Sequence, residues 1–167
     1  MDIPTYFHDL GDGFGIEWLP VISVEEVNGV RLPHVLELEL EVEDNRLVCV
    51  SFTAHRRANG PPVTADTLKM MPVVGAMNAA AVASEYLGLV RVKPDGTDVR
   101  VRKLDFDELP ELTRTSLAYR TALFLGMSPT SYVATILNVS RDVAAKRVQA
   151  ARRAGLLEPT TRGKKGA

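Results

Sequence analysis

Several residue types are scarce in this sequence, and each scarcity excludes a class of site. Cys49 is the only cysteine, which excludes an intrachain disulfide and a cysteine-based zinc site. The three histidines, His8, His34 and His55, are far apart and follow no metal-ligand spacing. No serine lies in a nucleophile-elbow motif. We therefore expect no enzyme activity, no metal site and no cofactor.

Long apolar runs are also lacking. The most apolar stretch, residues 70–83, is too short to span a bilayer and is interrupted by Pro72, Gly75 and Asn78. The N-terminus shows no basic segment followed by an apolar one, which would be typical of a signal peptide. We expect a soluble cytoplasmic protein, associated with the nucleoid, that has no membrane partner.

The charge of the chain is unevenly distributed. The 167 residues are 46% apolar and 25% charged, and their net charge is −1, which is typical of one globular domain or two small ones. Residues 1–110 hold 10 Lys+Arg and 18 Asp+Glu, a balance of −8, whereas residues 111–167 hold 10 Lys+Arg and 3 Asp+Glu, a balance of +7. A basic last third indicates a polyanionic partner, although a solvated basic helix is the simpler alternative.

The first part of the chain has the periodicity of β-strands. Residues 36–42 alternate between apolar side chains and glutamates, which predicts a strand with one buried and one acidic face. We expect residues 1–15 to be a loose lead-in, in spite of three closely spaced glycines. The other elements expected are strands within 16–24, around Val30 and over 47–52, an Asn28-Gly29 turn, helices over 64–70 and 73–87, and a hairpin of 89–92 with 99–104 around Pro94-Asp95-Gly96.

The last third has the pattern of three helices. An amphipathic helix is expected over residues 109–125 and ends at Gly126, and Ser128-Pro129 begins a second one. Asn138 then follows Ala134 by four residues, and Ser140 caps a third helix over 141–154 in which Val143, Ala144, Val148 and Ala151 face inward. A small residue, a left-handed turn residue and a cap at this spacing indicate a helix-turn-helix.

The expected fold class is therefore α+β. Residues 1–105 form an acidic N-terminal domain of antiparallel β-hairpins with one or two helices, which dimerises or binds a partner. Residues 106–158 form an all-α, three-helix DNA-binding unit, and residues 159–167 form a flexible basic tail.

In this arrangement the third helix would enter a major groove of double-stranded DNA, because the start of its outward face carries side chains suited to base edges. The residues expected at bases are Arg141, Asp142, Ala145, Lys146 and Gln149. Hydroxyls near helix starts and further cations would meet phosphates. The residues expected there are Thr130, Ser140, Arg147, Arg152, Arg153, Arg162, Lys164 and Lys165.

The same region resembles a known module. Residues 119–165 are similar to a helix-turn-helix domain of actinobacterial and phage proteins. The motifs that carry the resemblance are Tyr119-Arg120-Thr121-Ala122, Pro129-Thr130, Tyr132-Val133-Ala134, Asn138-Val139-Ser140-Arg141, Ala144-Ala145-Lys146-Arg147-Val148 and Ala151-Arg152-Arg153-Ala154-Gly155-Leu156-Leu157. Asn138 stands where the family has Gly. Residues 41–49 and 62–64 are also similar to the N-terminal part of these proteins. The resemblance implies DNA binding in a host-regulatory or mobile-element setting, without a target.

The sequence thus predicts a sequence-specific DNA-binding protein that regulates transcription, with a homodimer or a second protein held through residues 1–105. Two alternatives stay open. The module could deliver a phage protein to DNA for packaging or recombination. The chain could instead be a protein-interaction adaptor that uses its acidic sheet.

Overall fold

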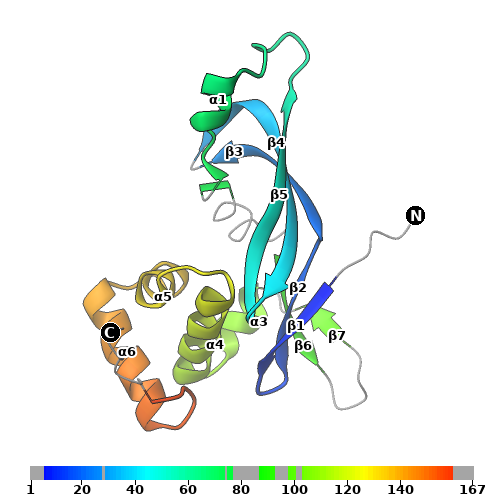
Figure 1. The fold of residues 1–167 in the computed structure, drawn as a ribbon. Helices are drawn as coiled ribbons and strands as arrows, with labels where there is room; N and C mark the ends of the chain where they lie inside the picture. Colours follow the sequence, from blue (N-terminus) through cyan, green and yellow to red (C-terminus); the bar gives the residue numbers. More distant parts are fainter. Residues whose placement is uncertain are drawn as a thin grey trace, which may run out of the picture. The chain divides into compact units, whose positions relative to one another are not determined.

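A computed structural model describes residues 6–27, 29–73, 75–76, 87–92, 98–100 and 103–159. The fold is α+β, as expected, and all the described strand pairs are antiparallel. The chain divides into two compact units. The first is Met1–Arg102 together with Phe124–Met127, and the second is Lys103–Leu123 together with Ser128–Ala167. The elements of both units are labelled in Figure 1.

One sheet of the first unit has four described strands in the order β1-β2-β6-β7. They are β1 (Tyr6–Gly11), β2 (Phe14–Trp18), β6 (Leu87–Val92) and β7 (Asp98–Arg100). The expected lead-in is wrong over residues 6–15, because β1 turns back on β2 there. Gly11, Asp12 and Gly13 all have positive φ, so the clustered glycines make a tight hairpin turn.

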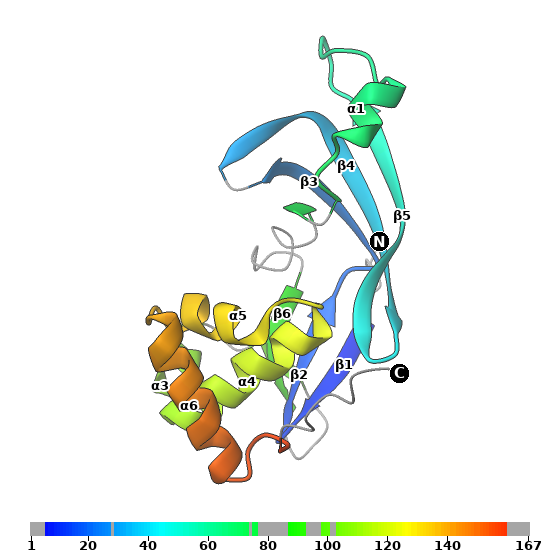
Figure 2. The ribbon, with the colours of Figure 1, turned by 60° about the vertical axis from the view of Figure 1, so that its left-hand side comes forward.

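The other sheet is formed by β3 (Val21–Val27), β4 (Val30–Glu43) and β5 (Arg46–Arg56) in that order. The predicted alternation is confirmed, since Leu36, Leu38 and Leu40 are at most 3% exposed while the glutamates between them are exposed. Asp44 and Asn45 both have positive φ, which is the two-residue hairpin loop that matches strand twist. β4 and β5 form a long curved pair in Figure 2.

Several other predictions for the first unit are confirmed only in part. Helix α1 (Ala65–Lys69) begins after Thr64, whose hydroxyl and that of Thr67 form a capping box. β7 ends at Arg100 and a helix begins at Lys103, so the strand expected to reach Leu104 is too long. Most of the helix expected over 73–87, the residue Asn28 and the turn at residues 94–96 lie outside the described residues.

The second unit holds α3 (Lys103–Glu108), α4 (Glu111–Phe124), α5 (Pro129–Ile136) and α6 (Arg141–Arg153). The predicted helices over 109–125 and 141–154 are confirmed to within two residues, and the second predicted helix begins at Pro129 as expected. The last residue of α4, Phe124, and the three residues that follow it, up to Met127, group with the first unit. A core cluster of small and branched side chains joins the helices of the second unit: Ala118, Val133, Ala144, Val148, Ala151 and Leu157. Because three of these residues are alanines, the helices can approach closely.

Candidate nucleic-acid interface

The connection between α5 and α6 is a tight left-handed turn. Asn138 has a φ of 50°, and its N–H donates to the carbonyl of Thr135 at 3.2 Å. The N–H of Val139 donates to the carbonyl of Ala134 at 3.0 Å. These two bonds form a Schellman motif, which satisfies carbonyls left unpaired at the end of α5. The left-handed turn residue expected at position 138 is therefore present.

The starts of the two helices are capped differently. The Ser140 hydroxyl accepts a hydrogen bond from the N–H of Val143 at 3.3 Å, which fixes the first turn of α6. Ser128 precedes α5 and Pro129 occupies its first position, but the Ser128 hydroxyl bonds to Ser131 Oγ at 3.2 Å and makes no cap. Proline has no backbone N–H, so at this position it leaves one fewer unpaired N–H group in the first turn of α5.

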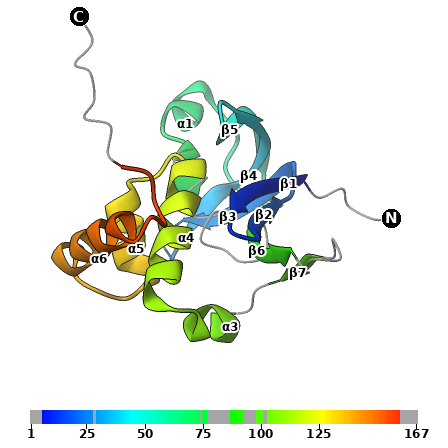
Figure 3. The same cartoon turned by 90° about the horizontal axis from the view of Figure 1, so that it is seen from below.

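Helix α6 separates an inner from an outer face. Ala144, Val148 and Ala151 are at most 3% exposed and belong to the core cluster. Residues 142, 146, 149 and 153 follow one another at helical spacing on the opposite side and are exposed. We call Asp142, Lys146, Gln149 and Arg153 the outer face of α6; Figures 1 and 3 show α6 beside α5. Val143 was expected to face inward, but it is 38% exposed because only one side of α6 is packed.

The residues predicted to contact bases lie together near the start of α6. Arg141, Asp142, Lys146 and Gln149 are exposed, and Ala145 is half-buried. Arg141, Lys146 and Arg153 have no ion-pair partner among the described residues. These three cations are therefore available to an external anion.

Two of the arginines predicted to contact phosphates have partners inside the second unit. Arg147 Nε lies 2.8 Å from Glu111 Oε1, and the Arg147 side chain is only 25% exposed. Arg152 Nη2 donates to Tyr119 Oη at 2.7 Å. Both bonds run from α6 to α4, so these arginines hold α6 in place. Their role at phosphates stays a prediction. A phosphate would have to compete with Glu111 for Arg147 and with Tyr119 for Arg152.

The other predicted phosphate contacts are scattered. Ser140 is exposed at the start of α6, whereas Thr130 is half-buried in the first turn of α5. Arg162, Lys164 and Lys165 lie outside the described residues.

Sequence reasoning assigned no role to Glu111 or Arg120. Glu111 pairs with Arg147, and Arg120 Nη2 donates to the carbonyl of Leu156 at 2.6 Å, which secures the segment after α6. The only available signal was that Glu111 is one of three acidic residues in the basic last third. The basic last third holds many cations with which a single carboxylate can pair, so the sequence does not predict which of them is the partner of Glu111.

The residues with potential catalytic chemistry do not converge. Within the described ranges, no three His, Cys, Asp or Glu side chains gather in a way that could hold a metal ion. His34 is fully buried in β4, and its ring nitrogens have no hydrogen-bond partner among the described residues. The Cys49 thiol is half-buried and donates to the Ser51 carbonyl, and burial raises its pKa. A raised pKa leaves less of the reactive thiolate near neutral pH.

Comparison with known proteins yields no relative. No family model matches the chain, and neither a curated protein nor a solved structure matches it significantly. Among the described helices, none is both long and apolar enough to cross a membrane.

Proposed function

We propose that this chain binds double-stranded DNA in a sequence-specific manner, with α5 and α6 as a helix-turn-helix and α6 in the major groove. The observation that carries the proposal is the junction at Asn138 and Ser140. Its left-handed turn and capped helix start leave the outer face of α6 exposed next to Arg141. A recognition helix contacts bases with residues of its N-terminal part.

In this proposal Arg141 and Lys146 donate to guanine and Gln149 pairs with adenine, because their donors and acceptors match those base edges. Asp142 and Ala145 lie beside them at the groove. Arg153, the Ser140 hydroxyl and Thr130, with Arg162, Lys164 and Lys165 of the tail, contact phosphates. Arg147 and Arg152 act first as positioning residues, since Glu111 and Tyr119 already bind them.

The biological setting we propose is transcription regulation, in agreement with the resemblance of residues 119–165. Because one recognition helix buries little surface, we also propose that the protein acts as a dimer through its first unit. Packaging or recombination of phage DNA is the alternative setting, and a footprint over a promoter would favour regulation.

The test is fluorescence anisotropy of the full chain with random duplex DNA over a range of salt, followed by selection of a preferred site. We expect binding that weakens steeply with salt. On the selected site, Gln149→Ala and Arg141→Ala should each lose about 1–3 kcal/mol, with little loss on random DNA. Arg153→Ala should weaken binding on all sequences alike and lower the salt slope by about 1.

The matched control is Arg46→Ala, which removes an exposed cation from the first unit and should leave DNA affinity unchanged. Absence of binding even at low salt would reject the proposal and favour the protein-interaction alternative. Equal losses for Gln149→Ala on selected and random DNA would show that α6 contacts only phosphates.

A further inference from the structure

One acidic side chain lies among the cations of α6. Asp142 is exposed on the outer face of this helix, beside the exposed Lys146. The basic last third holds two other acidic residues, Glu111 and Glu158. Glu111 is bound by Arg147, whereas Asp142 has no ion-pair partner among the described residues. A free carboxylate repels phosphates, so on a surface for DNA it lowers affinity unless it meets a hydrogen-bond donor of a base.

Asp142 and Lys146 are about one helical turn apart but do not pair. An acidic and a basic side chain four residues apart, with the acidic one nearer the helix start, can form an ion pair on a helix surface. Asp66 and Lys69 of α1 form such a pair within one turn, with 3.4 Å between Oδ1 and Nζ. No ion pair joins Asp142 to Lys146 in the described part of the chain. The outer face of α6 therefore presents a free acceptor beside a free donor.

A C·G base pair presents the complement of this arrangement in the major groove. Guanine presents the acceptors N7 and O6 there, and cytosine presents the N4 amino donor beside them. An A·T pair also presents a donor, at adenine N6, but this donor lies between the acceptors adenine N7 and thymine O4. A carboxylate at adenine would thus be repelled from both sides. At cytosine it has an acceptor on one side only, where the Lys146 ammonium can lie.

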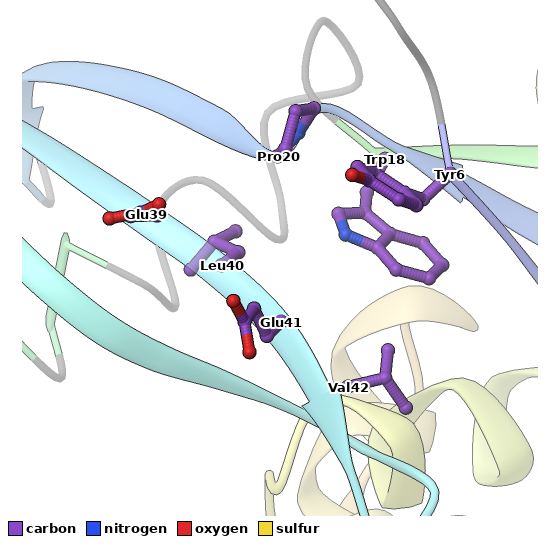
Figure 4. Close-up of a pocket in the computed structure, with 7 residues that line it drawn as sticks. All are labelled: Tyr6, Trp18, Pro20, Glu39, Leu40, Glu41 and Val42. Atoms are coloured by element: carbon purple, nitrogen blue, oxygen red, sulfur yellow. The ribbon is translucent and has the colours of Figure 1, made fainter.

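Free carboxylates of the first unit lack such a neighbour. Glu39 and Glu41 line a pocket between β1, β2 and β4, together with two aromatic side chains. Figure 4 shows Leu40 between these carboxylates and the rings, and the carboxylates point away from the rings. The two glutamates therefore belong to a solvated strand face. Asp142 differs from them because it lies beside cations, on a face that we assign to base edges.

We propose that Asp142 is a specificity-determining residue that selects a cytosine by accepting a hydrogen bond from the N4 amino group. Lys146 donates to the guanine that is paired with this cytosine. DNA sites of the protein then contain a C·G pair where the start of α6 lies in the groove. A T·A pair at that position would set thymine O4, an acceptor, against the carboxylate. This inference rests on the proposed DNA binding and adds to it the base that Asp142 recognises.

The simpler role of Asp142 is to stabilise its own helix. An acidic side chain in the first turn interacts favourably with the N-terminal end of the helix dipole. That role makes no distinction between bases. The two roles can therefore be separated by measuring how the base preference, and not only the affinity, depends on Asp142.

The test combines a variant of the protein with a variant of the DNA. After a preferred site has been selected with the wild type, each C·G pair of that site is replaced in turn by T·A, and affinity is measured by fluorescence anisotropy. At one position we expect the wild type to lose about tenfold or more. Asp142→Asn should lose less than about threefold there, because its amide can accept from cytosine N4 or donate to thymine O4. Asp142→Ala, which has no polar group at this position, should lose the discrimination as well.

The matched control is Glu158→Gln, which removes an exposed carboxylate from the same basic third but outside α6. Its loss on T·A replacement should stay within about twofold of the wild-type loss. Circular dichroism verifies that the variants are folded. Equal losses for the wild type and both Asp142 variants at every position would overturn the proposal and leave Asp142 its role in the first turn. Absence of DNA binding would reject this inference together with the proposed function, whereas DNA binding with equal losses would reject this inference alone.

Discussion

Asn138 shows how one backbone angle defines the connection between α5 and α6. Its φ of 50° is disfavoured for most L-residues but is accessible to asparagine and free for glycine. The side chain is exposed, so the residue contributes through its backbone and not through packing. The stability of the turn should therefore follow the intrinsic left-handed preference of the residue at this position.

Two variants of Asn138 are predicted to differ in the free energy of unfolding. Asn138→Gly should keep or slightly raise the free energy of unfolding, whereas Asn138→Ala should lower it by about 1 kcal/mol, since its Cβ is crowded at positive φ. Urea denaturation followed by circular dichroism measures both. An alanine variant as stable as the wild type would mean that the turn readjusts without strain.

Single residues also show where sequence reasoning reaches its limit. The turn at Asn138 and the cap at Ser140 were predicted because both depend on neighbours within five residues. The partners of Arg147 and Arg152 were not predicted, because Glu111 and Tyr119 are 36 and 33 residues away and meet them only through helix packing. The predicted site residues thus include both exposed cations and internally bonded ones.

At the scale of elements, the β1–β2 hairpin depends on a close approach of two strands. A Cβ added at Gly15 would collide with the Phe7 ring and would lie 2.9 Å from the His8 carbonyl oxygen. Gly15 pairs with Asp9 on one side and with Val90 on the other, so β2 has no free direction in which to move. Glycine at this position permits the packing of β1 across β2.

Gly15→Ala should therefore lower the free energy of unfolding by about 1–3 kcal/mol, measured by urea denaturation. The double variant Phe7→Ala/Gly15→Ala separates the two collisions. If the ring is the main obstacle, the double variant loses less than the sum of the single losses. Additive losses would place the conflict at the His8 carbonyl, and an unaffected Gly15→Ala variant would contradict the prediction.

Elements with strong local patterns were predicted, and those fixed by distant pairing were not. The alternation of β4 and the helices α4, α5 and α6 follow from periodicity. β1 was missed because its pairing partner determines it more than its own composition does. The run of residues 16–24 and the segment around Val30 were expected to add a strand or two between them. Residues 16–24 instead divide at Leu19-Pro20 into β2 and β3, which belong to different sheets. The sequence of a strand and its immediate neighbours does not indicate which sheet the strand joins.

At the scale of the whole molecule, the chain has two features through which copies can associate, its charge asymmetry and its exposed apolar side chains. The acidic residues 1–110 and the basic residues 111–167 attract one another between molecules at low salt. The first unit also exposes apolar side chains, among them Val21, Val50 and Phe52. Salt screens the former attraction and leaves apolar contact intact.

The proposed dimer of the first unit should therefore persist at high salt. We expect size-exclusion chromatography with light scattering, at tens of micromolar protein, to give the mass of a dimer both at low salt and at about 0.5 M NaCl, where the Debye length falls well below 10 Å. A dimer only at low salt would indicate charge-driven association. A monomer under both conditions would remove dimerisation from the proposed mechanism.

The residues that pack α6 against the second unit are separate from those of its outer face, and this separation has a consequence for protein engineering. The side chains that anchor this helix, Ala144, Val148 and Ala151 with Arg147 and Arg152, are different residues from those of its outer face. A combinatorial library that randomises positions 142, 146, 149 and 153 would therefore leave every described anchor in place. Such a library should yield mostly folded members, from which variants with new binding preferences could be selected.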